Sequence, residues 1–141
     1  AVACTGGLIG HMLTQVSGSS NYFKEGLVVY SNEAKVSRLG VEQQMLDEHG
    51  AVSEPVARLM AEGIRRVAGA DIGVSVTGIS GPTGGSDKKP VGLTYIAVSD
   101  STGTWCGKYI YTHDRIKNKE RTAQTALNLV RLRLLGLLEE A

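Results

Sequence analysis

Residues 71–77 read DIGVSVT, a run of apolar and β-branched residues that predicts a buried strand. The next thirteen residues, 78–90, are rich in Gly and Pro, which excludes regular secondary structure and lets the backbone approach a ligand closely. We call this segment the glycine loop. Two further strands are predicted at residues 91–99 and 103–111, and the polar stretch between them is typical of a hairpin turn.

Helical patterns precede this central block. Residues 8–16 place apolar side chains on one helical face directly after a Thr-Gly-Gly turn. A strand is expected at residues 23–30, followed by two short helices at 31–40 and 42–49. Residues 53–69 begin with Ser-Glu-Pro, which supplies a cap, an acid at the positive end of the helix dipole and a proline in the first turn.

A last helix follows the strands and is capped by Asp114. Its apolar face is expected to carry Ile116, Ala123, Leu127, Val130, Leu134 and Leu137. The order of helices and strands predicts an α/β fold, a three-layer α/β/α sandwich with a mixed sheet.

The length and composition fit a single domain over residues 1–141. A hydrophobic content of 42% in 141 residues is enough for one core. The chain opens on Ala-Val-Ala immediately before a turn, which is typical of the end of a strand. We therefore expect that a first helix and part of the first strand are missing and that the chain is a piece of a longer polypeptide.

Charge and cysteine content reduce the number of functional classes to which the protein can belong. The formal net charge is +1, and basic residues do not cluster with aromatic ones, so we expect no nucleic-acid partner. No apolar run is long enough for a membrane span, and we expect a cytoplasmic protein without a membrane partner. Cys4 and Cys106 fit neither a zinc motif nor a disulfide scaffold, and the three histidines have no metal-ligand spacing, so no metal or cofactor is expected.

Two Gly-containing segments could hold an anionic or polar ligand. The glycine loop offers backbone N–H groups and hydroxyls for this purpose, with Lys88 and Lys89 adding charge, although a flexible surface loop is an equally good interpretation. The Thr-Gly-Gly turn lies at a predicted helix N-terminus, and Arg115 begins the last helix, where it is either a ligand donor or a solvated terminus. The candidate substrate-binding residues are Thr5, Gly6, Gly7, Thr77, Gly78, Ser80, Gly81, Gly84, Gly85 and Arg115.

A candidate catalytic set lies at the ends of neighbouring elements. Ser20, Tyr30 and Lys35 combine a hydroxyl, a phenol and an amine that can act as nucleophile, relay and base if they converge. Lysine serves as a base only when its pKa falls, which burial and a helix N-terminus both promote. The alternative is an ordinary lysine beside a core tyrosine; as a first-turn residue, Lys35 is expected to carry little packing.

Several motifs occur together in one order. They are Cys-Thr-Gly-Gly at 4–7, Gly-Ser-Ser at 18–20, Tyr-Ser-Asn-Glu-Ala-Lys at 30–35, Gly-Ala-Val-Ser-Glu-Pro-Val at 50–56, Thr-Gly-Ile-Ser-Gly-Pro-Thr-Gly-Gly-Ser at 77–86, Lys-Pro-Val-Gly at 89–92 and Asp-Arg at 114–115. This set closely resembles the C-terminal domain of the CinA (competence/damage-inducible) proteins, which also occurs alone as nicotinamide mononucleotide deamidase. The resemblance covers nearly the whole chain.

The resemblance implies an amidohydrolase that converts nicotinamide mononucleotide and water to nicotinate mononucleotide and ammonia. The family is regarded as a serine hydrolase with a Ser/Lys pair, and its motif places the lysine on Lys35 and the tyrosine on Tyr30. A serine oxygen would attack the carboxamide carbon, and water would hydrolyse the acyl-enzyme after ammonia leaves. The glycine loop and Arg115 would hold ribose and phosphate. A nucleotide is thus the expected partner, together with further copies of the chain in a homo-oligomer.

The sequence departs from the family at one position that matters for catalysis. Members usually read Ala-Glu-Ser-Cys-Thr-Gly-Gly, whereas this chain has Val2 and Ala3 before Cys4, so the expected serine is absent. The candidate nucleophiles are therefore that missing serine, Ser20 and Cys4, whose thiol would be activated by a helix N-terminus. The main alternative to an enzyme is an inactive nucleotide-binding or interaction module of the same fold.

Overall fold

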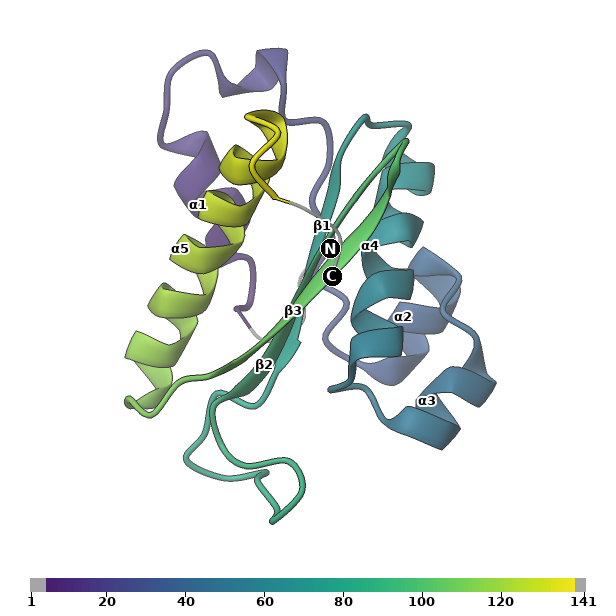
Figure 1. Ribbon diagram of the computed structural model, residues 1–141, viewed down its shortest axis with the longest axis vertical. Helices are drawn as coiled ribbons and strands as arrows, with labels where there is room; N and C mark the ends of the chain where they lie inside the picture. The colour runs from purple at the N-terminus through teal and green to yellow at the C-terminus, as the bar shows by residue number, and fades with distance from the viewer. Residues whose placement is uncertain (1–4, 139–141) are drawn as a thin grey trace.

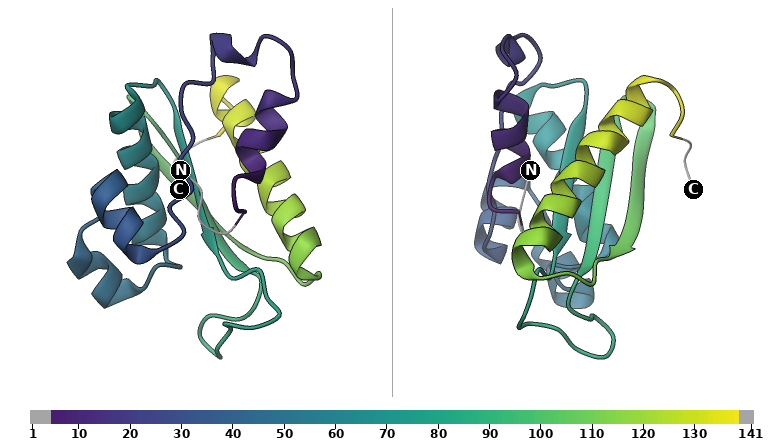
Figure 2. Two further views of the ribbon diagram at one scale, coloured as in Figure 1. Left: turned by 180° about the vertical axis from the view of Figure 1, so that it is seen from behind. Right: turned by 90° about the vertical axis from the view of Figure 1, so that its left-hand side faces the viewer.

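The described part of the chain, residues 5–138, forms a sheet between two layers of helices in the computed structural model (Figure 1). In chain order its elements are α1 (Leu8–Thr14), the short 3₁₀ helix η1 (Ser19–Asn21), α2 (Asn32–Leu39), α3 (Gln43–His49), α4 (Glu54–Ala68), β1 (Gly73–Gly78), β2 (Leu93–Asp100), β3 (Gly103–Ile110) and α5 (Arg115–Leu134). Helices α1 and α5 cover one face of the sheet, and α2, α3 and α4 lie on the other (Figures 1 and 2). The predicted α/β sandwich is confirmed.

The sheet has the strand order β1-β2-β3, and both pairings are antiparallel. Gly73 lies opposite Ser99 at one end of the first pair, and Leu93 lies opposite Ile110 at one end of the second. The predicted hairpin is therefore present. No parallel pair occurs among the strands of residues 5–138, and the strand end predicted at residues 1–3 lies outside the described residues.

Residues 23–30 do not form the predicted strand. They run in an extended path in which only Val28 makes an isolated bridge. A strand needs a continuous ladder with a neighbour, and β1, β2 and β3 form their described ladders only with one another. Val29 is nevertheless buried between the exposed Val28 and Tyr30, as expected for alternating side chains of an extended segment.

The last helix buries only part of the predicted face: Ala123 is buried, and Leu127 and Val130 pack against the core. Ile116, Leu134 and Leu137 are exposed by 69%, 69% and 66%, although Ile116 and Leu134 belong to α5 and all three were expected on its apolar face. The buried residues of α5 are Asn118, Thr122, Ala123, Ala126 and Leu129. The prediction was wrong at the two ends of the helix because it counted apolar residues only, whereas the buried face begins with two polar side chains that have partners inside the protein.

Two apolar cores flank the sheet. One lies between α1, the sheet and α5 and includes Ile9, Val76, Ile96, Ala123 and Leu129. The other lies among α2, α3 and α4 and includes Val29, Leu39, Leu46, Val56 and Met60. Among residues 5–138, no helix has the length and apolar composition that crossing a membrane requires.

Small residues bring α4 close to the sheet. Ala57 and Ala61 of α4 pack with Ala97 of β2, and all three side chains are fully buried. The Ser75 hydroxyl in β1 donates a hydrogen bond of 2.6 Å to the Ala57 carbonyl oxygen. A Cβ atom on Gly73 would collide with the Ala61 carbonyl oxygen, so the residue at position 73 has to be glycine.

An ion pair fixes the β2–β3 hairpin to the end of α5. Arg133 donates to both carboxylate oxygens of Asp100, at 2.6 Å from Nε and 2.9 Å from Nη2. The side chains are only 8% and 22% exposed, respectively. These hydrogen bonds, joined by one from the Thr102 hydroxyl, hold the pKa of Asp100 well below its usual range.

We predict that Asp100→Asn lowers the free energy of unfolding by about 2 kcal/mol at pH 7, because it removes the carboxylate that accepts two hydrogen bonds from the nearly buried Arg133 guanidinium. The folded-state pKa is lowered, so this contribution is complete above the unfolded-state pKa of about 4 and declines as the pH falls below it. Denaturant unfolding of wild type and variant between pH 2 and 7 measures it. Asp87→Asn, in the exposed glycine loop, is the control; an equal effect of both variants would contradict the prediction.

Candidate active site

Four segments that are distant in sequence meet at one end of the molecule. There β1 ends, α5 begins and the glycine loop leaves the sheet, at the lower end of Figure 1. The segment that leads into α2 and the turn that leads into α1 approach the same end. The contacts among these segments define the candidate site.

Arg115, the first residue of α5, connects three of these segments. Its Nη1 donates a hydrogen bond of 2.8 Å to the Gly81 carbonyl oxygen in the glycine loop. Its Nη2 donates one of 3.1 Å to the phenol oxygen of Tyr30. The planar guanidinium thus sets the position of the Tyr30 ring relative to the loop.

Lys35 lies in the first turns of α2 and is only 2% exposed. Its Nζ donates to the backbone carbonyl oxygens of Tyr30 and Ser31, at 3.2 and 3.5 Å. The Ser31 hydroxyl caps the helix by accepting from the Ala34 N–H at 3.0 Å. The expectation that Lys35 carries little packing was wrong, because its side chain is buried.

The turn before α1 is the fourth segment of the candidate site. A Cβ atom on Gly7 would lie 3.4 Å from Val28, and one on Gly6 would lie 3.7 Å from the Lys119 ammonium. Both glycines have positive φ angles, of 63° for Gly6 and 98° for Gly7, which side chains disfavour. Thr5 is 1% exposed, and its hydroxyl has no hydrogen-bond partner among the described residues.

Only the first residues of the glycine loop belong to the candidate site. The buried Asn118 of α5 donates from Nδ2 to the Ser80 carbonyl oxygen at 2.8 Å, while its Oδ1 accepts from the His113 N–H at 3.1 Å. Asn118 therefore fixes the Ser80–Gly81 segment against the start of α5. This role was missed in the sequence because a lone asparagine in an amphipathic helix gives no signal of burial.

Other predicted loop residues have different contacts. Thr77 donates its hydroxyl to the Ala51 carbonyl oxygen at 2.8 Å, and Gly78 allows a close approach of β1 to Thr94 of β2. Gly84 and Gly85 lie against Ile79 and Val91 of the loop region itself. Lys89 donates to the His49 carbonyl oxygen at 2.6 Å, which directs its charge toward the end of α3.

Ser20 does not join Tyr30 and Lys35. It is exposed in η1, beyond the C-terminal end of α1, whereas the Thr5–Gly7 turn of the site lies at the N-terminal end of that helix. In Figure 1 this loop is at the upper end of the molecule, and Figure 2 shows the same separation. The short spacing between Ser20 and Tyr30 suggested convergence, but the extended segment between them spans the molecule.

The two cysteines differ as candidate nucleophiles. Cys4 lies outside the described residues. Cys106 is buried, and this burial, with the negative charge of Glu54 nearby, raises the pKa of its thiol to about 12. Cys106 is thus a core thiol and not a nucleophile.

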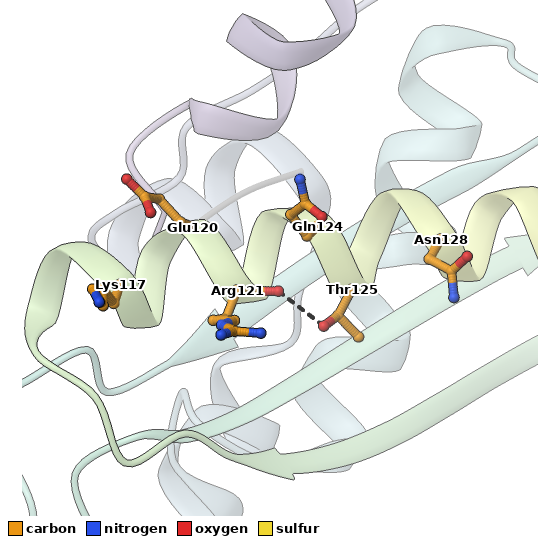
Figure 3. A pocket seen from close by; sticks show the side chains of 6 residues that line it. All are labelled: Lys117, Glu120, Arg121, Gln124, Thr125 and Asn128. Atoms are coloured by element: carbon orange, nitrogen blue, oxygen red, sulfur yellow. Dashed lines mark hydrogen bonds between the residues drawn. The ribbon is translucent and has the colours of Figure 1, made fainter.

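A polar hollow follows the outer face of α5 (Figure 3). Its lining side chains are Lys117, Glu120, Arg121, Gln124, Thr125 and Asn128. None of the predicted site residues lines it. Within residues 5–138, no group of three or more His, Cys, Asp or Glu side chains is placed to hold a metal ion.

The fold and the site define an α/β sandwich domain with a basic, glycine-lined candidate site at the N-terminal ends of three helices. The model of the CinA C-terminal domain matches residues 1–134. The chain therefore belongs to the CinA family.

Individual relatives agree with this assignment. A CinA-like protein of Geobacter sulfurreducens is 53% identical over 96% of this chain, and one of Syntrophus aciditrophicus is 51% identical over 93%. The chain spans only 33% and 31% of their lengths. The crystal structure of competence/damage inducible protein CihA from Agrobacterium tumefaciens superposes with a TM-score of 0.90 at 40% identity, covering 96% of this chain and 81% of that one.

We predict that Asn118→Ala loosens the glycine loop and lowers the free energy of unfolding by about 1–3 kcal/mol. The substitution leaves the Ser80 carbonyl and the His113 N–H without their partner. Limited proteolysis of residues 82–90 and denaturant unfolding measure the two effects. Asn128→Ala removes an exposed asparagine of the same helix that accepts hydrogen bonds from Arg131 and is the matched control; if both variants are cleaved at the same rate, Asn118 does not hold the loop.

Proposed function

We propose that this domain is an amidohydrolase that deamidates nicotinamide mononucleotide to nicotinate mononucleotide. The observation that carries the proposal is the burial of Lys35 at the N-terminal end of α2, beside the Tyr30–Arg115–Gly81 contacts. A buried amine at a helix N-terminus is the environment that favours a neutral, proton-accepting lysine. Family membership supports the same reaction class.

In this proposal each segment of the site has a separate role. Lys35 accepts the proton of the attacking nucleophile and returns it to the departing nitrogen, which leaves as ammonia. The Tyr30 phenol accepts from Arg115, whereas Lys35 donates to the backbone carbonyl oxygen of Tyr30; the tyrosine therefore orients the guanidinium at the substrate. Water then cleaves the acyl-enzyme and regenerates the nucleophile.

Ser20 lies away from Lys35, so we favour another residue as the nucleophile. The Thr5–Gly7 turn at the start of α1 is the part of the site that directly follows Cys4 and the position where the family has its serine. N–H groups at this turn are the natural donors for an oxyanion formed there.

A second candidate function is a nucleotide-binding module without turnover. Two observations favour it: the chain lacks the serine before Cys4, and Ser20 lies away from Lys35. In this case the site would bind the nucleotide and release no ammonia. The test is to incubate the purified protein with nicotinamide mononucleotide, measure ammonia, and measure binding of the same compound by calorimetry.

We predict that Lys35→Met reduces ammonia release about 100-fold or more, because general-base catalysis contributes about 10²–10⁴-fold. Methionine keeps most of the buried volume, so circular dichroism should confirm an intact fold. Ser20→Ala is the matched control and should leave turnover unchanged, since the residue lies at the other end of α1.

The outcomes separate the two candidates. If Lys35→Met released ammonia at the wild-type rate, Lys35 would not be part of the mechanism. Loss of turnover in Ser20→Ala would show that η1 moves to the site. Binding without ammonia release by the wild type would establish the module and exclude the enzyme.

A further inference from the structure

The strand β3 forms one edge of the sheet, and within residues 5–138 it pairs with β2 alone. The right-hand view of Figure 2 shows this edge on the side of the sheet away from α1. Tyr111, directly after β3, donates its N–H to the Gly92 carbonyl oxygen at 3.0 Å. Because the bonding direction alternates along an antiparallel strand, Tyr109, Gly107 and Trp105 also bond toward β2.

The alternate residues of β3 therefore direct their backbone N–H and C=O groups away from the sheet. At Thr104 this direction agrees with a contact of the carbonyl oxygen, which accepts from Nη1 of Arg58 on α4 at 2.5 Å. The outward groups of Cys106 and Lys108 face no strand of the described part of the chain. Proline, bulges or several charges protect many edge strands, but β3 has an unbroken register with β2, no proline and one charged residue. This edge is open to a further strand.

The side chains on one face of β3 are symmetric about Gly107. Trp105 and Tyr109 flank the glycine on the face that packs toward α5, and both are only partly buried there. A Cβ atom on Gly107 would collide with the Trp105 indole and crowd the Tyr109 ring, so the two rings lean over the glycine. If two copies of β3 paired antiparallel about a two-fold axis at Gly107, Trp105 of each would lie opposite Tyr109 of the other. These are non-hydrogen-bonded positions, at which aromatic side chains of neighbouring strands approach closely and stabilise the pairing.

The opposite face of the same edge carries complementary charges. In the register about Gly107, the exposed Lys108 lies opposite Cys106 of the second copy. The Glu54 carboxylate of α4 is near Cys106, where it adds to the effect of burial in raising the pKa of the thiol. The Lys108 ammonium would thus meet a carboxylate that is half-exposed and paired with Arg58 at 3.4 Å. A register centred on Lys108 would instead place two ammonium groups opposite each other, which is unfavourable.

We propose that the outer edge of β3 is a self-association surface, on which a second copy of this chain pairs antiparallel about a two-fold axis at Gly107. The sheet then continues from one copy into the other. Cys106 of each copy and Lys108 of the other form hydrogen-bonded pairs that exchange both N–H···O bonds. The contact is isologous, because the same residues are used on both sides. The candidate active site involves β1, α1, α2 and α5, so this inference does not rest on the proposed reaction.

Sedimentation equilibrium of the purified chain measures the association, and fluorescence shows where it occurs. Trp105 is the only tryptophan in the sequence. Dissociation of the dimer on dilution should therefore shift the tryptophan emission to longer wavelength, with the same midpoint as sedimentation, because water reaches the indole. A dimer that dissociates with unchanged emission would place the contact on another surface and overturn the proposal. A wild type that stays monomeric up to about 1 mM would overturn it as well.

Lys108→Pro tests the backbone pairing. It removes an N–H that points away from β2, so the β2–β3 ladder of the monomer should remain, which circular dichroism checks. The dissociation constant of the dimer should rise about tenfold or more, because the hydrogen bonds of both symmetric pairs are lost. An unchanged dissociation constant in the folded variant would contradict the proposal.

A charge exchange tests the register, and it decides the question if the proline variant does not fold. Lys108→Glu should raise the dissociation constant about threefold or more, because it places a carboxylate opposite Glu54. Adding Glu54→Lys should restore the affinity. Lys117→Glu makes the same charge change on the outer face of α5 and should have less than about a twofold effect. Equal effects of Lys108→Glu and Lys117→Glu, or no recovery in the double variant, would overturn the pairing about Gly107.

Discussion

The close contact of α4 with the sheet is the constraint on which the rest of the structure depends. Ala57, Ala61 and Ala97 let the helix approach, and Gly73 accommodates the Ala61 carbonyl oxygen. On the outer side of α4, a Cβ atom on Gly63 would collide with the carbonyl oxygen of Leu39, the last residue of α2. The sheet therefore positions α4, and α4 positions α2. This stack of small residues thereby fixes α2, the helix that carries Lys35, against α4.

The opposite layer is organised by polar contacts. Asn118 and Arg115 tie the start of α5 to consecutive carbonyl groups of the glycine loop, at Ser80 and Gly81. Arg115 also binds the Tyr30 phenol, so its guanidinium links α5 to the segment that leads into α2. The other end of α5 is held by the Asp100–Arg133 ion pair. The helix is thus fixed at both ends, and this fixes the direction of its cationic first turn.

The proposed functional groups lie on different helices, and this arrangement matters for the proposed function of the domain. In the proposed function the base lies on α2, the cations on α5 and the N–H donors at the start of α1, so the three roles come from different parts of the chain. The absence of serine before Cys4 affects only the α1 segment. Since the chain spans about a third of its curated relatives, the domain acts in them beside a much larger remainder.

The sequence by itself determined the helices, the hairpin, the caps of α2 and α5 and the family, because these depend on local patterns of apolar, capping and glycine residues. It also indicated that Tyr30, Lys35, Gly81 and Arg115 belong to candidate sites. It did not determine that residues 23–30 lack a ladder, that Ser20 lies at the far end of α1, or that Asn118 and Lys119 face the site. Those features were decided by the tertiary structure. The physical reason is that ladder pairing, burial of polar side chains and convergence of distant segments depend on which surfaces pack together, and no local spacing encodes that.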